Sequence, residues 1–164
     1  MNKASCAVCL LVSSTLAVCQ QPALSDNFVG TWQLNANKSS RSGVERESIQ
    51  IDFQGGQYKF VCDRLGENGT ELNWWFQTDM KGECVILTGV DGKPMSGTSC
   101  VTRLSPRKFV NDTKIIHEEY QVSSDGRQLI NHTKFKLEYA PGKRLPEVKL
   151  VFDRVLKDGS ALTH

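Results

Sequence analysis

The sequence predicts an all-β protein and, within that class, an antiparallel up-and-down β-barrel of about eight to ten strands. Two observations carry this prediction. Apolar and polar residues alternate with a period of two almost throughout the chain beyond residue 27. Turn sequences rich in glycine separate the alternating segments at short intervals, and no long segment shows the helical period of about 3.6 residues. Strands joined by hairpins, in a barrel or a sandwich, follow from this pattern.

The individual strands lie between recurring turn sequences. Gly-Gly, Asp-Gly and Pro-Gly pairs mark the hairpins, because glycine adopts the positive φ that tight turns require. The long polar connection at residues 36–46 is rich in Asn, Ser and Arg, and we expect it to hold a short helix or a lid. The expected strands are residues 28–35, 47–53, 57–64, 71–78, 83–88, 97–104, 107–112, 115–123, 127–139 and 146–156.

Residues 1–23 have the layout of a secretory signal peptide, with a cation at Lys3, an apolar stretch and a polar end at Gln20 and Gln21, and residues 1–19 are the expected signal itself. We expect cleavage after Cys19, or as late as residue 23. A lipid anchor on Cys19 is the alternative, although the residue before it is larger than a lipobox normally has. No other apolar run is long enough to span a membrane as a helix. Residues 27–164 are therefore predicted to form a single exported domain, secreted or periplasmic.

The charge balance excludes one broad class of function. The chain of 164 residues carries 20 Lys and Arg against 18 Asp and Glu, a formal net charge of +2. A charge this close to zero offers no stripe that neutralises phosphates, so nucleic acid is not an expected partner. Charges of both signs are interspersed along the chain, which is typical of one folded domain, and we expect it to be a monomer.

The cysteines predict one disulfide. Of the six cysteines, three lie in or beside the signal segment, and Cys62, Cys84 and Cys100 remain. A hairpin centred on Gly92 places Cys84 directly across from Cys100, so we expect these two to be joined in an oxidising compartment. Cys62 alternates in phase with Phe60 and is expected to point inward as an inert thiol.

Neither a metal ion nor a cofactor is expected. His117, Glu119 and His132 meet on the predicted outer face, where cross-strand pairs of His and Glu are ordinary, and no cysteine spacing indicates zinc. Four Asn-X-Ser/Thr sequons allow two interpretations, glycosylation on surface loops of a eukaryotic protein or chance occurrence. They lie at Asn37, Asn68, Asn111 and Asn131.

Two hairpins near the C-terminus can be registered from the sequence. A two-residue turn at Asp125-Gly126 directs one face of both strands inward. A two-residue turn at Pro141-Gly142 then continues this face onto the last strand and sets Arg154 opposite Leu129. The first hairpin pairs Ile116 with Phe135, Glu118 with Thr133, Tyr120 with Asn131 and Val122 with Leu129.

Three polar residues, Glu118, Asn131 and Thr133, therefore fall on the buried face. A buried carboxylate is costly unless it is paired or reached by water, and Arg154 on the same face is an obvious partner for one of these three groups. Two interpretations stay open. In the first interpretation their role is structural: the three groups satisfy one another, or Glu118 lies at an open rim. Alternatively, they form a polar anchor at the end of an apolar cavity.

The segment Phe28-Val29-Gly30-Thr31-Trp32 resembles the Gly-X-Trp opening of the calycin superfamily, which includes lipocalins, fatty-acid-binding proteins and avidins. In that superfamily the Trp closes one end of the barrel beneath a basic side chain from the last strand. The resemblance implies that Trp32 and Arg154 are this structural pair. It extends over essentially the whole mature chain, whose ends look like those of short exported bacterial lipocalin-like domains.

The departures from the superfamily limit what the resemblance implies about the ligand. The Asp and aromatic pattern of an avidin-type biotin site is not evident. The paired basic residues that hold a carboxylate in intracellular fatty-acid-binding proteins are also not recognisable, apart from Arg154.

The barrel and the resemblance together predict a non-enzymatic carrier for a small, mainly apolar molecule held inside the barrel. Alternation directs Trp74 inward and leaves Trp75 outward, where we expect residues 36–46 to cover it. The expected ligand-binding residues are Tyr58, Phe60, Trp74, Phe76, Ile116, Tyr120 and Phe135, with Leu72 beside them in the lining and Glu118, Asn131 and Thr133 as polar anchors.

Two other classes of function are kept as alternatives. The first is a protein-binding or inhibitor-like module that acts through its loops. The second is a cofactor-free isomerase or cyclase that uses the barrel cavity, with Glu118 and Tyr120 as the candidate acid or base. No arrangement of nucleophile, base and orienting group can be identified in the sequence. The sequence therefore favours a protein without enzymatic activity, and no catalytic residue is assigned.

Overall fold

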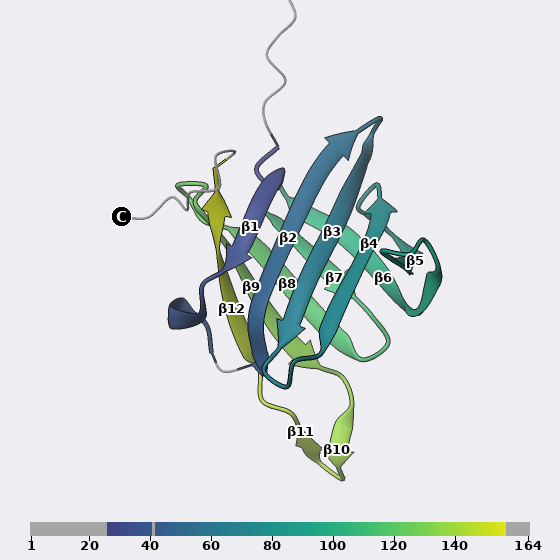
Figure 1. Cartoon of the computed structure of the whole chain (residues 1–164), viewed down its shortest axis with the longest axis vertical. Helices are drawn as coiled ribbons and strands as arrows, with labels where there is room; N and C mark the ends of the chain where they lie inside the picture. Colours follow the sequence, from purple (N-terminus) through teal and green to yellow (C-terminus); the bar gives the residue numbers. More distant parts are fainter. Residues whose placement is uncertain (1–25, 41, 157–164) are drawn as a thin grey trace, which may run out of the picture.

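The computed structural model describes residues 26–40 and 42–156, so the expected signal segment, residues 1–19, lies outside the described residues. Within them, ten antiparallel strands close into one barrel in the order β1-β12-β9-β8-β7-β6-β5-β4-β3-β2 (Figure 1). The strands of the barrel are β1 (Gly30–Leu34), β2 (Val44–Gln54), β3 (Gln57–Gly66), β4 (Glu71–Thr78), β5 (Lys81–Gly89), β6 (Pro94–Ser105), β7 (Lys108–Asp112), β8 (Ile116–Val122), β9 (Gln128–Phe135) and β12 (Val148–Val155). This confirms the predicted fold class.

The turn chemistry explains why neighbouring strands pair in their observed registers. At the β2–β3 hairpin, Gly55 and Gly56 adopt φ values of 61° and 83°, which a two-residue hairpin turn requires of both central residues. Gln54 therefore faces Gln57 across the turn. The predicted β8–β9 register is also confirmed, with Glu118 opposite Thr133.

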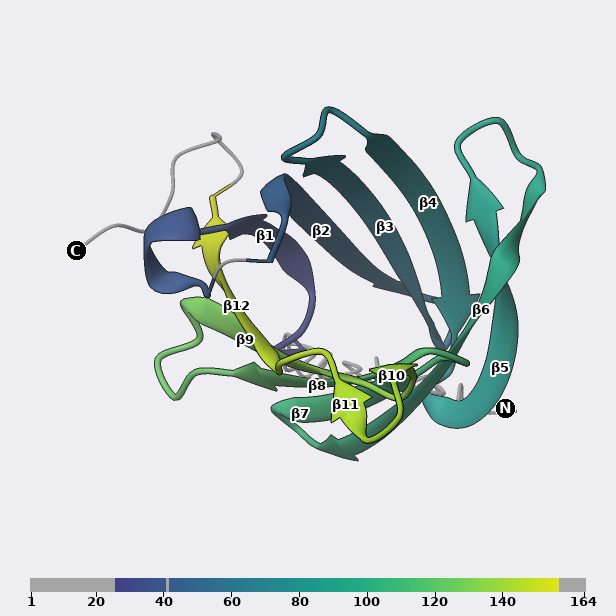
Figure 2. The same cartoon turned by 90° about the horizontal axis from the view of Figure 1, so that it is seen from below.

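The connection from β9 to β12 differs from the prediction. We expected one long strand over residues 127–139 and a tight turn into the last strand. Instead β9 ends at Phe135, and a separate small hairpin of β10 (Glu138–Ala140) and β11 (Lys143–Arg144) extends from the end of the barrel (Figure 2). Its pairing is irregular and is stabilised by Gly142, whose backbone N–H donates to the Glu138 side chain at 2.9 Å.

The extra hairpin shifts the register of β12 by two residues. Phe152, not Arg154, lies opposite Leu129, so the predicted pairing of Arg154 with Leu129 is wrong. A shift of two preserves the face that each side chain occupies, because side chains alternate with a period of two. Arg154 therefore still faces inward, but closer to the end of the barrel where β1 begins, and pairs across strands with Trp32.

The closed end of the barrel, formed by residues 26–29 with Trp32 and Arg154, is densely packed. Trp32 and Phe28 are fully buried, and the Trp32 indole N–H donates to the Phe28 carbonyl at 2.9 Å. The Arg154 guanidinium lies 4.3 Å above the Trp32 ring and donates to the Asn27 carbonyl at 2.6 Å. The expected structural pair of Trp32 and Arg154 is thus present in the folded chain.

Residues 36–40 pack against the last strand. Ala36–Lys38 form the short 3-10 helix η1, as expected for the polar connection. Ser39 and Ser40 continue along β12, where Ser40 exchanges hydrogen bonds with Lys149. We had expected this segment to cover Trp75, but it does not. The Lys59 ammonium lies 5.1 Å above the Trp75 ring instead, because both side chains project from the outer faces of adjacent strands.

The expected disulfide joins Cys84 of β5 to Cys100 of β6, which are direct cross-strand partners. Cys62 is buried and carries a free thiol, and burial is the main reason that its pKa is raised far above the usual range. Among the described residues, no helix has the length and apolar character needed to cross a bilayer.

Candidate functional site

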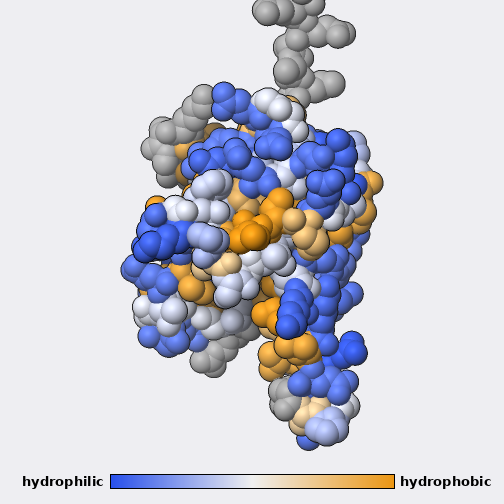
Figure 3. Space-filling model, turned by 90° about the vertical axis from the view of Figure 1, so that its right-hand side faces the viewer, coloured by the Kyte–Doolittle hydropathy of each residue, from blue (hydrophilic) through white to orange (hydrophobic). Residues whose placement is uncertain are grey.

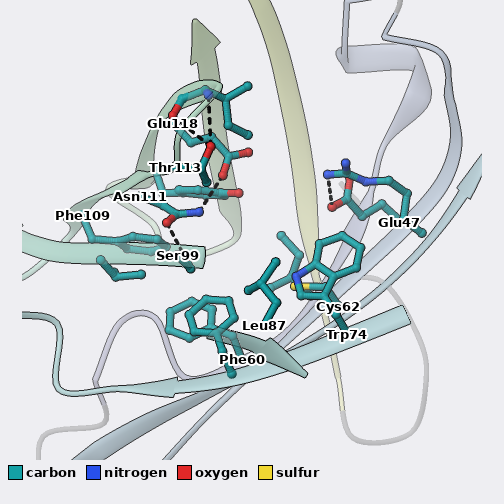
Figure 4. Close-up of a pocket in the computed structure, with 16 residues that line it drawn as sticks. Glu47, Phe60, Cys62, Trp74, Leu87, Ser99, Phe109, Asn111, Thr113 and Glu118 are labelled. Carbon is teal, nitrogen blue, oxygen red and sulfur yellow. Dashed lines mark hydrogen bonds and ion pairs between the residues drawn. The ribbon is translucent and has the colours of Figure 1, made fainter. Parts of the chain in front are cut away.

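A cavity of about 120 Å³ lies inside the barrel, walled by strands β2 to β8 (Figure 4). Its apolar lining mixes aliphatic and aromatic side chains that alternation directs inward. These are Ile49, Phe60, Cys62, Trp74, Phe76, Leu87, Val101, Phe109, Ile116 and Tyr120. Polar groups line it at six further positions, Glu47, Arg64, Ser99, Asn111, Thr113 and Glu118.

Stacked aromatic pairs from adjacent strands build much of the apolar wall. The rings of Phe60 and Phe76 stack with centroids 4.8 Å apart, and those of Phe109 and Tyr120 with centroids 4.6 Å apart. Each pair is a direct cross-strand pair, an arrangement that adds to the stability of a sheet. The cavity therefore has rigid apolar surfaces from both halves of the barrel.

An ion pair between a buried carboxylate and a half-buried arginine lies in the cavity wall. Glu47 of β2 and Arg64 of β3 are direct cross-strand partners, and the Arg64 Nη2 donates to Glu47 Oε1 at 2.7 Å. The Arg64 guanidinium also lies 5.3 Å above the Trp74 ring. Burial alone would lower the pKa of Arg64, but the Glu47 charge and its hydrogen bond outweigh burial, so this pKa is raised. Arg64 therefore stays cationic.

Two atoms of this ion pair lack partners. Glu47 is only 2% exposed. Among the residues that the structure describes, Glu47 Oε2 and Arg64 Nε belong to the few buried side-chain polar atoms without a hydrogen-bond partner. An unpartnered buried oxygen is costly, because it has lost water without gaining a donor. Here both residues line a cavity, so a bound molecule could reach them.

Glu118 lies in the cavity wall formed by β7 and β8. The Asn111 amide donates to Glu118 Oε2 at 2.8 Å, and Ser99 donates to Asn111 Oδ1 at 2.6 Å. Burial raises the pKa of Glu118, and neither the hydrogen bond from Asn111 nor the charge of Arg64 cancels that effect. Arg154, which we expected to pair with Glu118, Asn131 or Thr133, lies instead at the closed end, where it donates to the Asn27 carbonyl.

Six of the ten expected ligand-binding residues line this cavity, whereas the other four, and Leu72 beside them, do not. Those that line it are Phe60, Trp74, Phe76, Ile116, Glu118 and Tyr120. Of the others, Asn131 and Thr133 are buried and bonded to each other at 2.7 Å, which is one of the structural roles left open by the sequence. Phe135 is half-buried at the end of β9, and Leu72 is 44% exposed at the start of β4.

Tyr58 belongs to a separate polar cluster at the closed end. Its hydroxyl donates to Asp26 and accepts a hydrogen bond from Arg103 at 2.7 Å. Burial, followed by the hydrogen bond to Asp26, raises the pKa of Tyr58 to about 12. Arg103 also lies 5.1 Å from the centre of the Phe28 ring, so the cluster helps to seal this end.

The Glu47–Arg64 pair was not predicted, although the sequence contains a turn from which it follows. A two-residue turn at Gly55-Gly56, registered as the later hairpins were, sets Glu47 opposite Arg64. It also sets Arg64 in phase with Cys62, which was expected to face inward. Asn111 was noted only as a sequon. The cross-strand partner of Asn111 is Glu118, which could not be identified before β7 and β8 were paired.

The structure separates the four sequons into two groups. Asn37 and Asn68 are exposed, so both can accept a glycan in the folded state. Asn131 is 1% exposed and Asn111 donates to Glu118 inside the barrel, so neither can do so without unfolding.

The outer face of β8 and β9 shows ordinary ion pairs. Glu119 pairs with Lys108 at 2.7 Å, and His132 lies 3.4 Å from Glu147. Within residues 26–40 and 42–156, no three His, Cys, Asp or Glu side chains are placed to share a metal ion.

Comparison with known proteins identifies the fold and no closer relationship. No family model matches the sequence, and no curated protein matches it. Among solved structures, a Schistosoma mansoni fatty acid binding protein in complex with arachidonic acid superposes with a TM-score of 0.54 and 12% identity, covering 79% of this chain and 97% of that chain. Fatty-acid-binding protein 1 of Echinococcus granulosus gives 0.53 and 14% identity, covering 79% and 98%.

The fluorescent protein UnaG is similar to the same degree, with a TM-score of 0.52 and 13% identity over 79% of this chain and 98% of that chain. At these identities the likeness concerns backbone architecture and not the residues of a site. The chain therefore has the ten-strand antiparallel barrel fold of the fatty-acid-binding-protein type, within the calycin-like architecture that its sequence resembles.

Proposed function

We propose that this protein is a non-enzymatic carrier that holds a small, mainly apolar molecule inside its barrel. The observation that supports this proposal is the internal cavity, lined by aromatic and aliphatic side chains and a few convergent polar groups. Such a combination is the usual form of a small-molecule site. Structures of similar fold include a protein in complex with arachidonic acid, which is consistent with an internal ligand.

The size of the cavity favours a compact ligand. Its volume of about 120 Å³ is smaller than the roughly 300–1,000 Å³ of pockets that hold drug-sized molecules. It is close to an engineered cavity of about 150 Å³ that binds benzene. The cavity therefore favours a ligand with one or two rings or a short chain. A long acyl chain would require side chains such as Leu87 or Trp74 to move.

A cavity-filling variant tests the proposal. Leu87 and Ile86 are neighbours on β5, but Leu87 lines the cavity whereas Ile86 is 59% exposed. Leu87→Trp should fill the cavity, and Ile86→Trp is the matched control on the outer face. Native mass spectrometry of protein purified from its source should show a small-molecule adduct for the wild type and for Ile86→Trp. The adduct should be absent for Leu87→Trp.

Calorimetric titration with naphthalene gives a second measurement on the same three proteins. We expect binding to the wild type and to Ile86→Trp, and at least tenfold weaker binding to Leu87→Trp. If the wild type retains no adduct and does not bind naphthalene, the carrier proposal is wrong.

We also propose that the mature protein is exported, as in the short bacterial lipocalin-like domains that its sequence resembles. The signal-like layout of residues 1–19 and the disulfide between Cys84 and Cys100 support this proposal, because disulfides persist mainly in oxidising compartments. N-terminal sequencing of the protein recovered from the medium or periplasm should begin after Cys19. An intact Met1 on protein confined to the cytosol would refute export.

The alternative of a protein-binding module is favoured by one observation. Apolar side chains are exposed on the β5–β6 hairpin, where Val90 is 74% and Ile86 is 59% exposed. Apolar surface also extends onto the protruding β10–β11 hairpin (Figure 3). If this surface binds a protein, Val90→Ser should abolish the interaction and leave the binding of naphthalene unchanged. The isomerase or cyclase alternative, with Glu118 and Tyr120, stays a prediction.

A further inference from the structure

The polar groups of the cavity include more carboxyl groups than cations. Glu47 and Glu118 contribute two carboxyl groups, and Arg64 is the cationic side chain among the lining residues. Arg64 is already bonded to Glu47 at 2.7 Å, and it packs on Trp74. Glu47 therefore offsets the charge that Arg64 would offer to a second carboxylate, although Arg64 Nε has no hydrogen-bond partner.

The second carboxyl group lies across the cavity from this pair. Figure 4 shows Glu118 and Asn111 on one side and Glu47 on the other, with the apolar side chains between them. Glu118 accepts a hydrogen bond from the Asn111 amide at 2.8 Å and another from the Tyr120 side chain. A bound anion would meet a carboxyl group on either side, and Glu47 already offsets the charge of the guanidinium.

The unpartnered atoms indicate what kind of group would fit. Glu47 Oε2 is a buried acceptor without a donor, in a side chain that is 2% exposed and lines the cavity. An ionised carboxylate accepts hydrogen bonds and donates none. A ligand that satisfies this oxygen must therefore bring an O–H or N–H group. A hydroxyl or amine does so, whereas a carboxylate adds a third acceptor and a like charge.

We propose that the ligand of this cavity is an apolar molecule with a hydrogen-bond-donating hydroxyl or amine, received by Glu47, and that carboxylates are excluded. This inference rests on the carrier function proposed above. It makes Glu47 and Glu118 the residues that determine specificity. It also separates this chain from the similar structure solved with arachidonic acid, whose ligand is a carboxylic acid.

Three probes with the same ring and nearly the same size test the proposal on the wild-type protein. They are 2-phenylethanol, 2-phenylethylamine and phenylacetate, titrated by calorimetry or ligand-observed NMR at pH 7.4. We expect the alcohol, the amine or both to bind at least tenfold more tightly than phenylacetate. Preference for the amine would indicate that Glu118 releases its proton to pair with the ammonium. Preference for the alcohol would indicate that Glu118 stays protonated.

Naphthalene separates failure of this inference from failure of the carrier function. If naphthalene binds and phenylacetate binds as tightly as the two donors, the cavity is a carrier site but the proposed specificity is wrong. The specificity is equally wrong if naphthalene binds and none of the three polar probes does. If no probe binds, including naphthalene, both proposals are wrong.

Substitution of the acceptor should reverse the ranking. Glu47→Gln removes the charge that occupies Arg64, so the affinity for phenylacetate should rise at least tenfold while that for the alcohol falls. Glu45→Gln makes the same change at an exposed position of the same strand and should leave all affinities unchanged. Unchanged affinity for phenylacetate in a folded Glu47→Gln variant would contradict the proposal. If that variant does not fold, the wild-type ranking still decides.

Discussion

The closed end of the barrel and the internal cavity both contain charged side chains, but these side chains have different roles. At the closed end, Arg154 covers Trp32 and bonds a backbone carbonyl, while Asp26 accepts from the Phe28 backbone as well as from Tyr58 and Arg103. These groups hold residues 26–29 across the end of the barrel. Their contacts are with the chain itself, so their role is structural.

In the cavity, the charged groups face a space instead of a covering segment. Glu47 and Arg64 satisfy each other only in part, and Glu118 depends on the Asn111 amide. Burying an ion pair contributes little to stability on balance, because desolvation offsets most of the attraction. The comparison indicates that buried charge closes the barrel at one end and is available for recognition in the cavity.

The largest expected effect is at the closed end. Trp32→Ala removes a fully buried indole, the hydrogen bond to Phe28 and the surface beneath Arg154. We expect a loss of about 3–5 kcal/mol in the free energy of unfolding, measured by denaturant titration. The control is Trp75→Ala, whose ring lies on the outer face under Lys59 and should lose much less. Equal losses in the two variants would contradict the assignment of Trp32 as the closing residue.

The second effect concerns the cavity wall. Strands β4 and β5 pair at only two positions among the described residues, Trp74 with Gly89 and Trp75 with Thr88, whereas the disulfide reinforces the more extensive pairing of β5 with β6. Replacing Cys84 and Cys100 by Ala should lower the free energy of unfolding by about 3 kcal/mol, given a sequence separation of 16. A mass measurement of the non-reduced wild type that detects both cysteines as free thiols would refute the disulfide.

The third effect tests the cation of the closed end. Arg154→Ala removes a charged hydrogen bond to the Asn27 carbonyl and the contact with the Trp32 ring. We expect a loss of about 1.5–3 kcal/mol, seen as a lower melting temperature. Arg107→Ala removes an exposed arginine from the turn between β6 and β7 and is the control. An unchanged melting temperature for Arg154→Ala would remove the main support for closure of the calycin type.

The smallest effect distinguishes the two faces of β8 by their response to pH. Burial raises the pKa of Glu118 above its value in the unfolded chain, so between the two values the folded chain binds more protons. The contribution of Glu118 to stability therefore falls as pH rises through that range. The melting temperature of Glu118→Gln relative to the wild type should rise between pH 4 and pH 8.

Glu119, next in the chain, provides a control of opposite sign. The hydrogen bond from Lys108 lowers the pKa of Glu119, so its contribution is present above the pKa of the unfolded chain and is lost as pH falls. Glu119→Gln should therefore lose stability relative to the wild type as pH rises. If Glu118→Gln also lost stability relative to the wild type as pH rises, Glu118 would not face a buried environment.

Much of the fold follows from local pattern, and the errors have a common cause. The β8–β9 register and the cross-strand cysteines were predicted because each depends on one tight turn and on alternation. The position of Arg154 was wrong by two residues because residues 138–144 form their own irregular hairpin. The irregular pairing of that hairpin cannot be predicted from its turn sequence alone.

The candidate site was predictable to a smaller extent. The alternation of apolar and polar residues along each strand was sufficient to predict that Phe60, Trp74 and Phe76 point inward, and all three line the cavity. It was not sufficient for Asn131 and Thr133, which face inward but bond to each other outside the cavity lining. Alternation determines the face of a side chain, whereas its place along the barrel axis depends on how all ten strands are staggered.

The sequence by itself determined the class of fold, the inward face of β3, β4, β8, β9 and β12, and the pairing of Cys84 with Cys100. These depend on period-two alternation and turn chemistry, which act over a few residues. Only the tertiary structure decided the register of the last strand, the place of Glu47 and Arg64 in the wall of a cavity, and that the cavity stays partly unfilled. Those features depend on closure between β1 and β12 and on how the side chains of separate strands fill the interior.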